Sequence, residues 1–218
     1  MESTKSLKRA CTDASKEARR QSILDAGMEL FLANPYELPT VSAISKRCNI
    51  AKGTIYIYFK TKEEIFINII ESLFTGFVNA TKAIILTSKG ESNVVEYIVN
   101  KWCDYYSENR MMVMLAGVSN NIIEANIDVE SASAHKKSLQ IQVLSLGETL
   151  SKVLNKDKFF CASMLMRSYA ITLGISRISN LTEKVQEAHK GGAEFIAPEF
   201  RGELYNTLLP FWNGSLAE

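Results

Sequence analysis

The sequence contains few of the residues that build metal sites or sites of covalent chemistry. Its 218 residues include four cysteines and two histidines. The cysteines are scattered, with no CxxC pair and no metal-ligand spacing, so we expect reduced thiols, some of them packed in the core. Neither His135 nor His189 has an acid or a cysteine at ligand spacing. We therefore expect no metal and no other cofactor.

Long hydrophobic runs and catalytic motifs are also missing from the sequence. No apolar run approaches the ~20 residues of a membrane span. The N-terminus is polar and charged where a signal peptide would be apolar. We find no Gly-rich phosphate loop, no GxSxG motif and no histidine paired with an acid at catalytic spacing. These absences predict a cytoplasmic protein that is not an enzyme and has no membrane partner.

The net charge is small but unevenly distributed along the chain. The whole chain carries +1, which by itself argues against nucleic-acid binding. Residues 1–62, however, hold eleven Lys and Arg against six Asp and Glu, and the remainder holds fourteen against eighteen. Because phosphate binding depends on the local field, this distribution fits a DNA-binding domain joined to a separate regulatory domain.

Hydrophobic spacing predicts helices along the whole chain, without strand alternation. The fourth helix opens at a Thr61-x-x-Glu64 capping box and runs toward Leu86, a rod of nearly 40 Å at about 1.5 Å per residue. A loop is expected over 181–198. The other helices are expected near 15–33, 41–48, 52–58, 91–108, 110–125, 129–154, 158–180 and 199–213. The fold class is therefore all-α, with about nine helices.

Residues 40–65 have the pattern of two short helices joined by a tight turn. Asn49 lies where the apolar phase breaks, and Asn tolerates the left-handed backbone that a sharp turn demands. The second helix leaves Lys52, Thr54, Tyr56 and Tyr58 exposed. All four can hydrogen-bond to phosphates or base edges, and none is acidic. This profile indicates a helix-turn-helix whose second helix enters the DNA major groove.

Residues 19–65 resemble the DNA-binding domain of the tetracycline-repressor (TetR) family of bacterial transcription regulators. The matching residues are RRQSILDAGMELF at 19–31, Thr40-Val41, Ile44, Lys52-Gly53-Thr54-Ile55-Tyr56, Tyr58-Phe59 and Thr61-Lys62-Glu63. The sequence departs from the family at the turn, where Cys48-Asn49-Ile50-Ala51 replaces Ala-Gly-Val-Ser. Ala51 thus leaves the recognition helix without its usual hydroxyl cap, a loss of about 1 kcal/mol.

The resemblance implies which residues contact DNA. It assigns contact to Thr40, Lys52, Thr54, Tyr56, Tyr58 and Lys62, and Gly53 lets the backbone approach closely. The chemistry agrees, because hydroxyls, lysines and the N–H groups of a helix N-terminus all bind phosphates. The alternative is that a tyrosine packs inside and the lysines are merely solvated.

The family also implies a domain division and a dimer. We expect a mobile basic tail over 1–15, a DNA-binding domain over 16–62 and a helical effector-binding and dimerisation domain over 63–218. In the family the last two helices of each subunit pair across the dimer interface, and two paired subunits read half-sites one DNA turn apart. The corresponding candidates are Met164, Ile171, Ile175, Leu204, Leu208, Leu209 and Trp212. Alternatively, these side chains only complete the core of the monomer.

Soft and aromatic side chains in the larger domain suit an adaptable small-molecule pocket, and suit an ordinary core equally well. The candidate ligand-binding residues are Trp102, Tyr105, Tyr106, Met114, Asn121, Met164 and Arg167. Nothing in the sequence identifies the ligand beyond an apolar or amphipathic character.

The sequence thus predicts a homodimeric repressor that a small apolar or amphipathic effector releases from a pseudo-palindromic double-stranded DNA operator. The family implies that a shift of the fourth helix spreads the recognition helices. The alternative is a DNA-bound adaptor whose C-terminal domain recruits another protein. A closed cavity of several hundred Å³ would favour the sensor, and a solid core with an exposed apolar patch would favour the adaptor.

Overall fold

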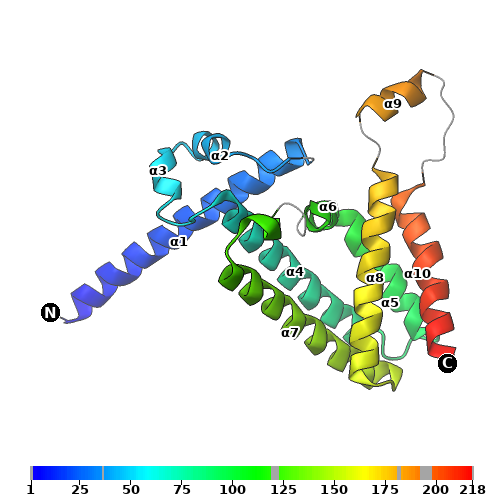
Figure 1. The fold of residues 1–218 in the computed structure, drawn as a ribbon. Coiled ribbons are helices and arrows are strands. Elements are labelled where there is room, and N and C mark those ends of the chain that lie inside the picture. Colours follow the sequence, from blue (N-terminus) through cyan, green and yellow to red (C-terminus); the bar gives the residue numbers. More distant parts are fainter. Residues whose placement is uncertain (1, 36, 119–122, 181–182, 192–197, 218) are drawn as a thin grey trace. The chain divides into compact units, whose positions relative to one another are not determined.

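The computed structural model describes residues 2–35, 37–118, 123–180, 183–191 and 198–217, and the regular elements among them are helices. The chain divides into two compact units. Unit 1 comprises Met1–Glu71 with Ser119–Ala132, and unit 2 comprises Ser72–Val118 with Ser133–Glu218. The predicted all-α class, with an N-terminal helix-turn-helix, is confirmed (Figure 1).

Unit 1 is built on a long first helix. Helix α1 (Glu2–Ala33) begins at Glu2 and not near Ser15, so the predicted start was wrong. The early residues contain no Gly or Pro, and extending an existing helix is far easier than nucleating one. The mobility of the tail stays a prediction. Helix α1 ends as expected before Asn34-Pro35.

The two short helices of unit 1 lie on the same side of α1 (Figure 1). The Thr40 hydroxyl caps α2 (Val41–Arg47) by accepting the N–H of Ala43 at 3.1 Å. Asn49 has a φ of 54°, which confirms the left-handed turn. Helix α3 (Lys52–Ile55) is shorter than predicted, and Ala51 provides no side-chain cap.

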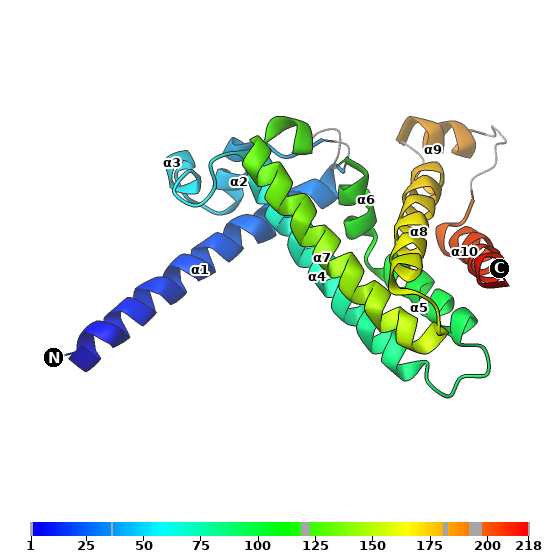
Figure 2. The same cartoon turned by 60° about the horizontal axis from the view of Figure 1, so that its bottom comes forward.

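Helices α4 (Lys62–Thr87) and α7 (Val129–Leu154) each run from unit 1 into unit 2. Inside unit 2 they lie side by side in both views of the ribbon (Figure 2). Thr75 of α4 donates a hydrogen bond to Gln142 of α7 at 3.3 Å. Gly90, with a φ of 103°, lies in the turn after α4.

The rest of unit 2 contains a pair of buried tryptophans. It consists of α5 (Val94–Glu108), α6 (Arg110–Val118), α8 (Lys158–Ser179), α9 (Glu183–Lys190) and α10 (Phe200–Ala217). The rings of Trp102 on α5 and Trp212 on α10 lie 5.5 Å apart. Arg201 of α10 also binds α5, through Asp104 at 2.6 Å and Asn100 at 2.8 Å. The contact between the two tryptophans and the hydrogen bonds of Arg201 therefore both join α5 to α10.

Three predicted boundaries in this part of the chain were wrong. Residues 183–190 form α9 where a loop was expected, because Glu, Lys, Gln and Ala favour helix even without an apolar stripe. Helix α10 continues through Pro210 to Ala217. Helix α6 ends at Val118, and a short 3₁₀ turn follows at Glu124–Asn126.

Within the described ranges, two helices are long and apolar enough to cross a membrane by length and composition alone, α4 and α8. Of their apolar windows, 33% and 44% are buried inside the chain, and core helices of water-soluble proteins pass the same test. Among the described residues no group of three or more His, Cys, Asp or Glu could hold a metal ion.

Candidate nucleic-acid interface

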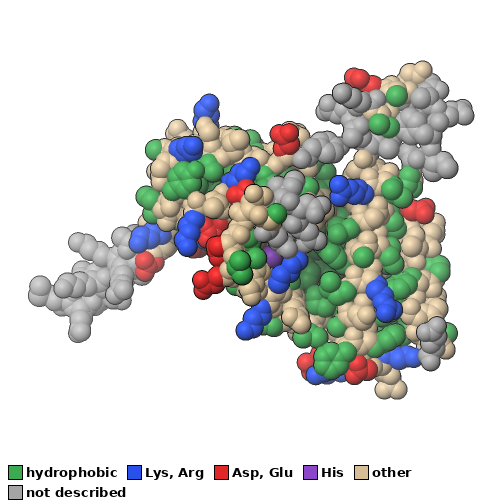
Figure 3. Space-filling view, in the orientation of Figure 1, with side chains coloured by type: hydrophobic (Ala, Val, Ile, Leu, Met, Phe, Trp, Pro, Cys, Tyr) green, Lys and Arg blue, Asp and Glu red, His purple; other side chains and the backbone are tan. Residues whose placement is uncertain are grey.

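The recognition helix presents polar side chains to solvent. Lys52 and Gly53 are exposed, Thr54 is half-buried, and Tyr56 is 48% exposed. A Cβ built on Gly53 would meet no atom within 4 Å, so this stretch of backbone is open to a close approach. In Figure 3, Lys and Arg side chains gather over the part of unit 1 where α2 and α3 lie. The local field on this surface is therefore positive.

Apolar anchors hold this helix from beneath. Ile55 is fully buried, and Phe59 nearly so. On the far side of the core, the rings of Phe31 and Phe66 lie 6.1 Å apart. Ile55 and Phe59 point inward, whereas Tyr56 and Ile57 between them face solvent.

The start of α4 lies directly after the recognition segment. The Thr61 hydroxyl accepts the N–H of Glu64 at 3.1 Å, which is the first half of the predicted capping box. The Glu64 carboxylate accepts the N–H of Lys60 and not that of Thr61, so the second half is displaced by one residue. Lys62 is half-buried, with its Nζ 3.9 Å from a Glu63 carboxylate oxygen. Lys62 can therefore reach a phosphate only by leaving a weak ion pair.

Two other predicted contacts have partners within unit 1. The Thr40 oxygen is already an acceptor in the α2 cap, which leaves its hydroxyl hydrogen free to donate. Arg47, a basic residue of α2 that could also contact phosphate, binds Glu29 of α1 at 2.7 Å. Tyr58 is half-buried. Its neighbour Ile57 is 78% exposed, a surface position that the sequence analysis did not single out.

The cysteine nearest this surface is held in its thiol form. Cys48 donates its Sγ hydrogen to the Ser22 carbonyl at 3.3 Å. Burial raises the pKa of the Cys48 thiol, with Arg19 and Arg47 opposing the shift. In unit 2, burial likewise raises the pKa of Cys103 to about 12. Raised thiol pKa values disfavour the reactive thiolate, in agreement with the reduced thiols expected from the sequence.

Two family models match this chain. Residues 23–69 match the bacterial regulatory proteins of the tetR family, and residues 71–218 match the tetracyclin repressor-like C-terminal domain. The chain belongs to the TetR family. This family is one of DNA-binding transcriptional regulators and not of enzymes.

Similar TetR-family sequences align over a limited part of the chain. The fatty acid metabolism regulator protein of Bacillus subtilis is 38% identical over 63 residues, 29% of this chain and 32% of that protein. IcaR of Staphylococcus epidermidis, a negative transcriptional regulator of a biofilm operon, is 33% identical over 60 residues, 28% of this chain and 32% of IcaR. The chain thus spans about a third of the length of these curated relatives.

A solved TetR-family structure shares the fold over most of the chain. FadR of Bacillus subtilis, crystallised with stearoyl-CoA, has a TM-score of 0.51 and 18% identity. The match covers 88% of this chain and 96% of FadR. At this level of identity the similarity concerns the fold alone.

The candidate ligand residues of this TetR-family chain are scattered between core and surface. Trp102, Tyr106 and Met164 are buried, Tyr105 and Met114 are half-buried, Arg167 is exposed, and Asn121 lies outside the described residues. Tyr105 and Tyr106 stack around Phe77, with ring centroids 5.6 and 5.2 Å from it. Burial raises the pKa of both tyrosines. The structure brings the aromatic candidates together and leaves Arg167 apart from them.

The candidate interface residues of the TetR-family dimer are mostly buried within the single chain. Ile171 and Leu209 are half-buried, whereas Met164, Ile175, Leu204, Leu208 and Trp212 are buried. The Trp212 Nε1 donates to the Ser168 hydroxyl at 2.9 Å, which ties α10 to α8 inside one monomer. The buried five therefore have little surface to offer a second copy. Only Ile171 and Leu209 stay as interface predictions.

Proposed function

We propose that this TetR-family regulator is a homodimeric repressor that reads a pseudo-palindromic operator through α3. In this proposal residues 16–62 form the DNA-binding domain and residues 63–218 the effector-binding and dimerisation domain. The observation that carries the proposal is the row formed by the exposed Lys52 and Tyr56 and the half-buried Thr54 over the buried Ile55. Such a row can donate hydrogen bonds to base edges and phosphates and contains no acid to repel them.

An exposed stripe on α8 supports the dimer. Met166, Ala170, Gly174 and Ile178 are all exposed and follow one another at four-residue steps, so they share one face of the helix. Met166 is 51% and Ile178 59% exposed, unusual for large apolar side chains. Figure 3 shows apolar side chains along the side of unit 2 where α8 and α10 are seen. Small residues between larger ones allow a second helix to approach closely.

An apolar or amphipathic effector fits the interior of unit 2. Among the described residues, the buried Trp102 Nε1 and Thr81 Oγ1 have no hydrogen-bond partner. A buried donor without an acceptor costs about 1–3 kcal/mol, which a ligand carrying an acceptor would recover. FadR, which shares this fold, was crystallised with stearoyl-CoA. We propose an effector with an apolar body and at least one acceptor group, acting on a cytoplasmic regulator.

A filled core favours a second candidate, the DNA-bound adaptor. The crevice of unit 2 lined by Val95, Val99, Leu150 and Trp212 has essentially no volume open to a water-sized molecule. Ordinary ligand pockets hold about 300–1,000 Å³, so effector binding requires the core to open. A thermal-shift series with acyl-CoAs of increasing chain length distinguishes the candidates. A sensor gains stability and releases DNA, and an adaptor responds to none of them.

Substitutions on α3 test the proposed DNA contact. Lys52→Ala and Tyr56→Ala should each weaken binding to a duplex selected from random-sequence DNA by about 1–3 kcal/mol. Helicity and the mass of the dimer should not change, because both side chains are exposed. Lys89→Ala, an exposed lysine in unit 2, is the matched control. Equal affinities for all three variants would remove α3 from the interface.

A further inference from the structure

A groove in unit 1 lies between α1 and the turn that follows α3. It is lined by Lys16, Glu17, Arg20, Ile57 and Tyr58 and has a volume of about 230 Å³. The turn residues come directly after the recognition helix. The groove therefore lies beside the DNA-reading surface, although nothing in the sequence pattern marked it.

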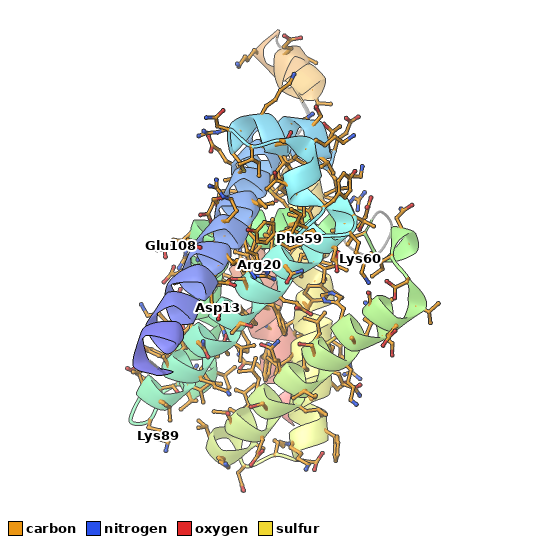
Figure 4. All side chains as sticks on the ribbon, turned by 90° about the vertical axis from the view of Figure 1, so that its left-hand side faces the viewer. Asp13, Arg20, Phe59, Lys60, Lys89 and Glu108 are labelled. Atoms are coloured by element: carbon orange, nitrogen blue, oxygen red, sulfur yellow. The ribbon has the colours of Figure 1, made fainter. Side chains whose placement is uncertain are left out.

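Arg20 is a fixed cation in this groove. Its Nη2 donates a hydrogen bond to the Asn68 side chain of α4, and its guanidinium lies 5.2 Å from the centre of the Phe59 ring. Figure 4 shows Arg20 and Phe59 side by side. The Arg20 side chain is nevertheless 34% exposed. A guanidinium held by three elements and still open to solvent is preorganised for an anion.

The other groove residues combine charge with apolar surface. Lys16 is exposed and has no ion pair within the described residues. Tyr58 offers a hydroxyl, and the exposed Ile57 offers an apolar face next to it. A DNA backbone has the matching alternation, because each anionic phosphate is followed by a deoxyribose whose carbon face is apolar.

We propose that this groove binds one backbone phosphate of the operator together with its deoxyribose, outside the bases that α3 reads. Lys16 and Arg20 contact the phosphate, Tyr58 donates its hydroxyl, and Ile57 packs on the sugar. Phosphate contacts of this kind set the register of a protein on the duplex without reading its sequence. The inference rests on the proposed DNA-binding role of α3.

Glu17 opposes the phosphate in this arrangement. Its carboxylate lies 3.5 Å from the Arg20 guanidinium and is largely exposed. The phosphate and Glu17 then compete for the same cation. Removing the charge of Glu17 should therefore strengthen DNA binding, the opposite of removing the charge of Lys16.

The test compares charge and apolar variants of the full-length protein by titrating a duplex selected from random-sequence DNA at several salt concentrations. Lys16→Gln should weaken binding about threefold to tenfold and reduce the slope of log affinity against log salt by about 0.9. Ile57→Ala should weaken binding to a similar degree with an unchanged slope, because an apolar contact releases no counterion. Glu17→Gln should tighten binding.

Matched controls lie in unit 2. Lys89→Gln removes the same charge from an exposed position, and Leu86→Ala truncates an exposed apolar side chain. Neither should alter affinity or slope. If Lys89→Gln weakened binding as much as Lys16→Gln, the effect would come from net charge and the groove contact would be refuted.

A scan of neutral methylphosphonate substitutions locates the phosphate. At one position on each half-site, neutralising the phosphate should abolish the difference between the wild type and Lys16→Gln. An equal difference at every position would refute a local contact. Lys52→Ala is titrated alongside: if it weakens binding while Lys16→Gln does not, the groove proposal alone falls. If neither weakens binding, the proposed role of α3 falls with it.

Discussion

The residue before the first helical position distinguishes α3 from α2. Ala51 has φ −65° and ψ 143°, the extended conformation of an N-cap residue, but has no side-chain oxygen to accept a hydrogen bond. Thr40 has nearly the same backbone angles at the start of α2 and accepts the Ala43 N–H. The recognition helix is thus built with a cap position whose capping atom is missing.

Ala51→Ser should stabilise the protein by about 0.5–1 kcal/mol, because the new hydroxyl would accept an N–H from the first turn of α3. The measurement is the urea midpoint of unfolding at constant m-value. Ala51→Val, which adds atoms without an acceptor, is the control and should give no gain. Equal midpoints for the two variants would contradict the capping argument.

At the residue scale, the sequence could predict chemistry but not always exposure. Lys52 and Tyr56 are exposed as expected, because the buried Ile55 between them fixes the helix face. Ile57 could not be placed, since its exposure depends on the turn in which α3 ends. Leu208 could not be assigned either, because a monomer core and a dimer interface both require apolar side chains at helical spacing.

Between elements, α7 and α8 approach each other closely at one glycine. A Cβ on Gly147 would lie 2.6 Å from the Lys158 carbonyl oxygen and 3.0 Å from the Ala162 Cβ. Both are backbone or backbone-linked atoms that cannot rotate away. The sequence showed a glycine inside a helix, which normally only weakens it, whereas the helix crossing explains its presence.

Gly147→Ala should destabilise the protein by about 1–3 kcal/mol through overpacking, despite the better helix propensity of alanine. Gly214→Ala in α10, where the new methyl would meet no atom within 4 Å, is the paired control and should be neutral or stabilising. Thermal unfolding of both variants gives the comparison. A stable Gly147→Ala variant would show that α7 and α8 can move apart at no cost.

Two carboxylates at helix starts make the stability of the fold depend on pH in the acid range. Hydrogen bonds from Ser131 lower the pKa of Asp128 before α7, and backbone hydrogen bonds from Gly202 and Arg201 lower the pKa of Glu199 before α10. A lowered folded-state pKa contributes stability that is complete above the ordinary values of 3.8 and 4.5 and is lost as the pH falls below them.

Asp128→Asn and Glu199→Gln should therefore lower stability near neutral pH and flatten the acid side of the stability curve, because the contribution that they remove is already lost at low pH. Urea midpoints measured between neutral pH and about pH 3 provide the test. The double variant should lose less stability than the wild type over the same range. A parallel loss in both proteins would mean that other groups govern acid unfolding.

For the whole molecule, the sequence predicted the class, the helix-turn-helix and the family, since these depend on local patterns that survive in any packing. It underestimated the length of α1 and missed α9, because neither the first turns of α1 nor α9 carry an apolar stripe that would mark them as helix. The faces of α8 and α10 that are proposed to meet a second subunit could not be predicted from the sequence, because it does not show which apolar side chains are already buried within one chain. The structure shows which of them are buried.

Substitutions at buried and at exposed positions of α8 and α10 should have different effects. The first should disrupt folding, and the second should disrupt only the dimer. Leu208 is fully buried in the single chain, so Leu208→Asp should unfold the protein, at a cost above about 4 kcal/mol.

Ala170 is exposed on the α8 stripe, so Ala170→Arg should give folded monomers by light scattering, with native helicity. These monomers should bind the selected duplex weakly, because one helix-turn-helix reaches only one half-site. Ala134→Arg, at an exposed position on α7, should stay dimeric, and a dimeric Ala170→Arg variant would place the subunit contact on another face.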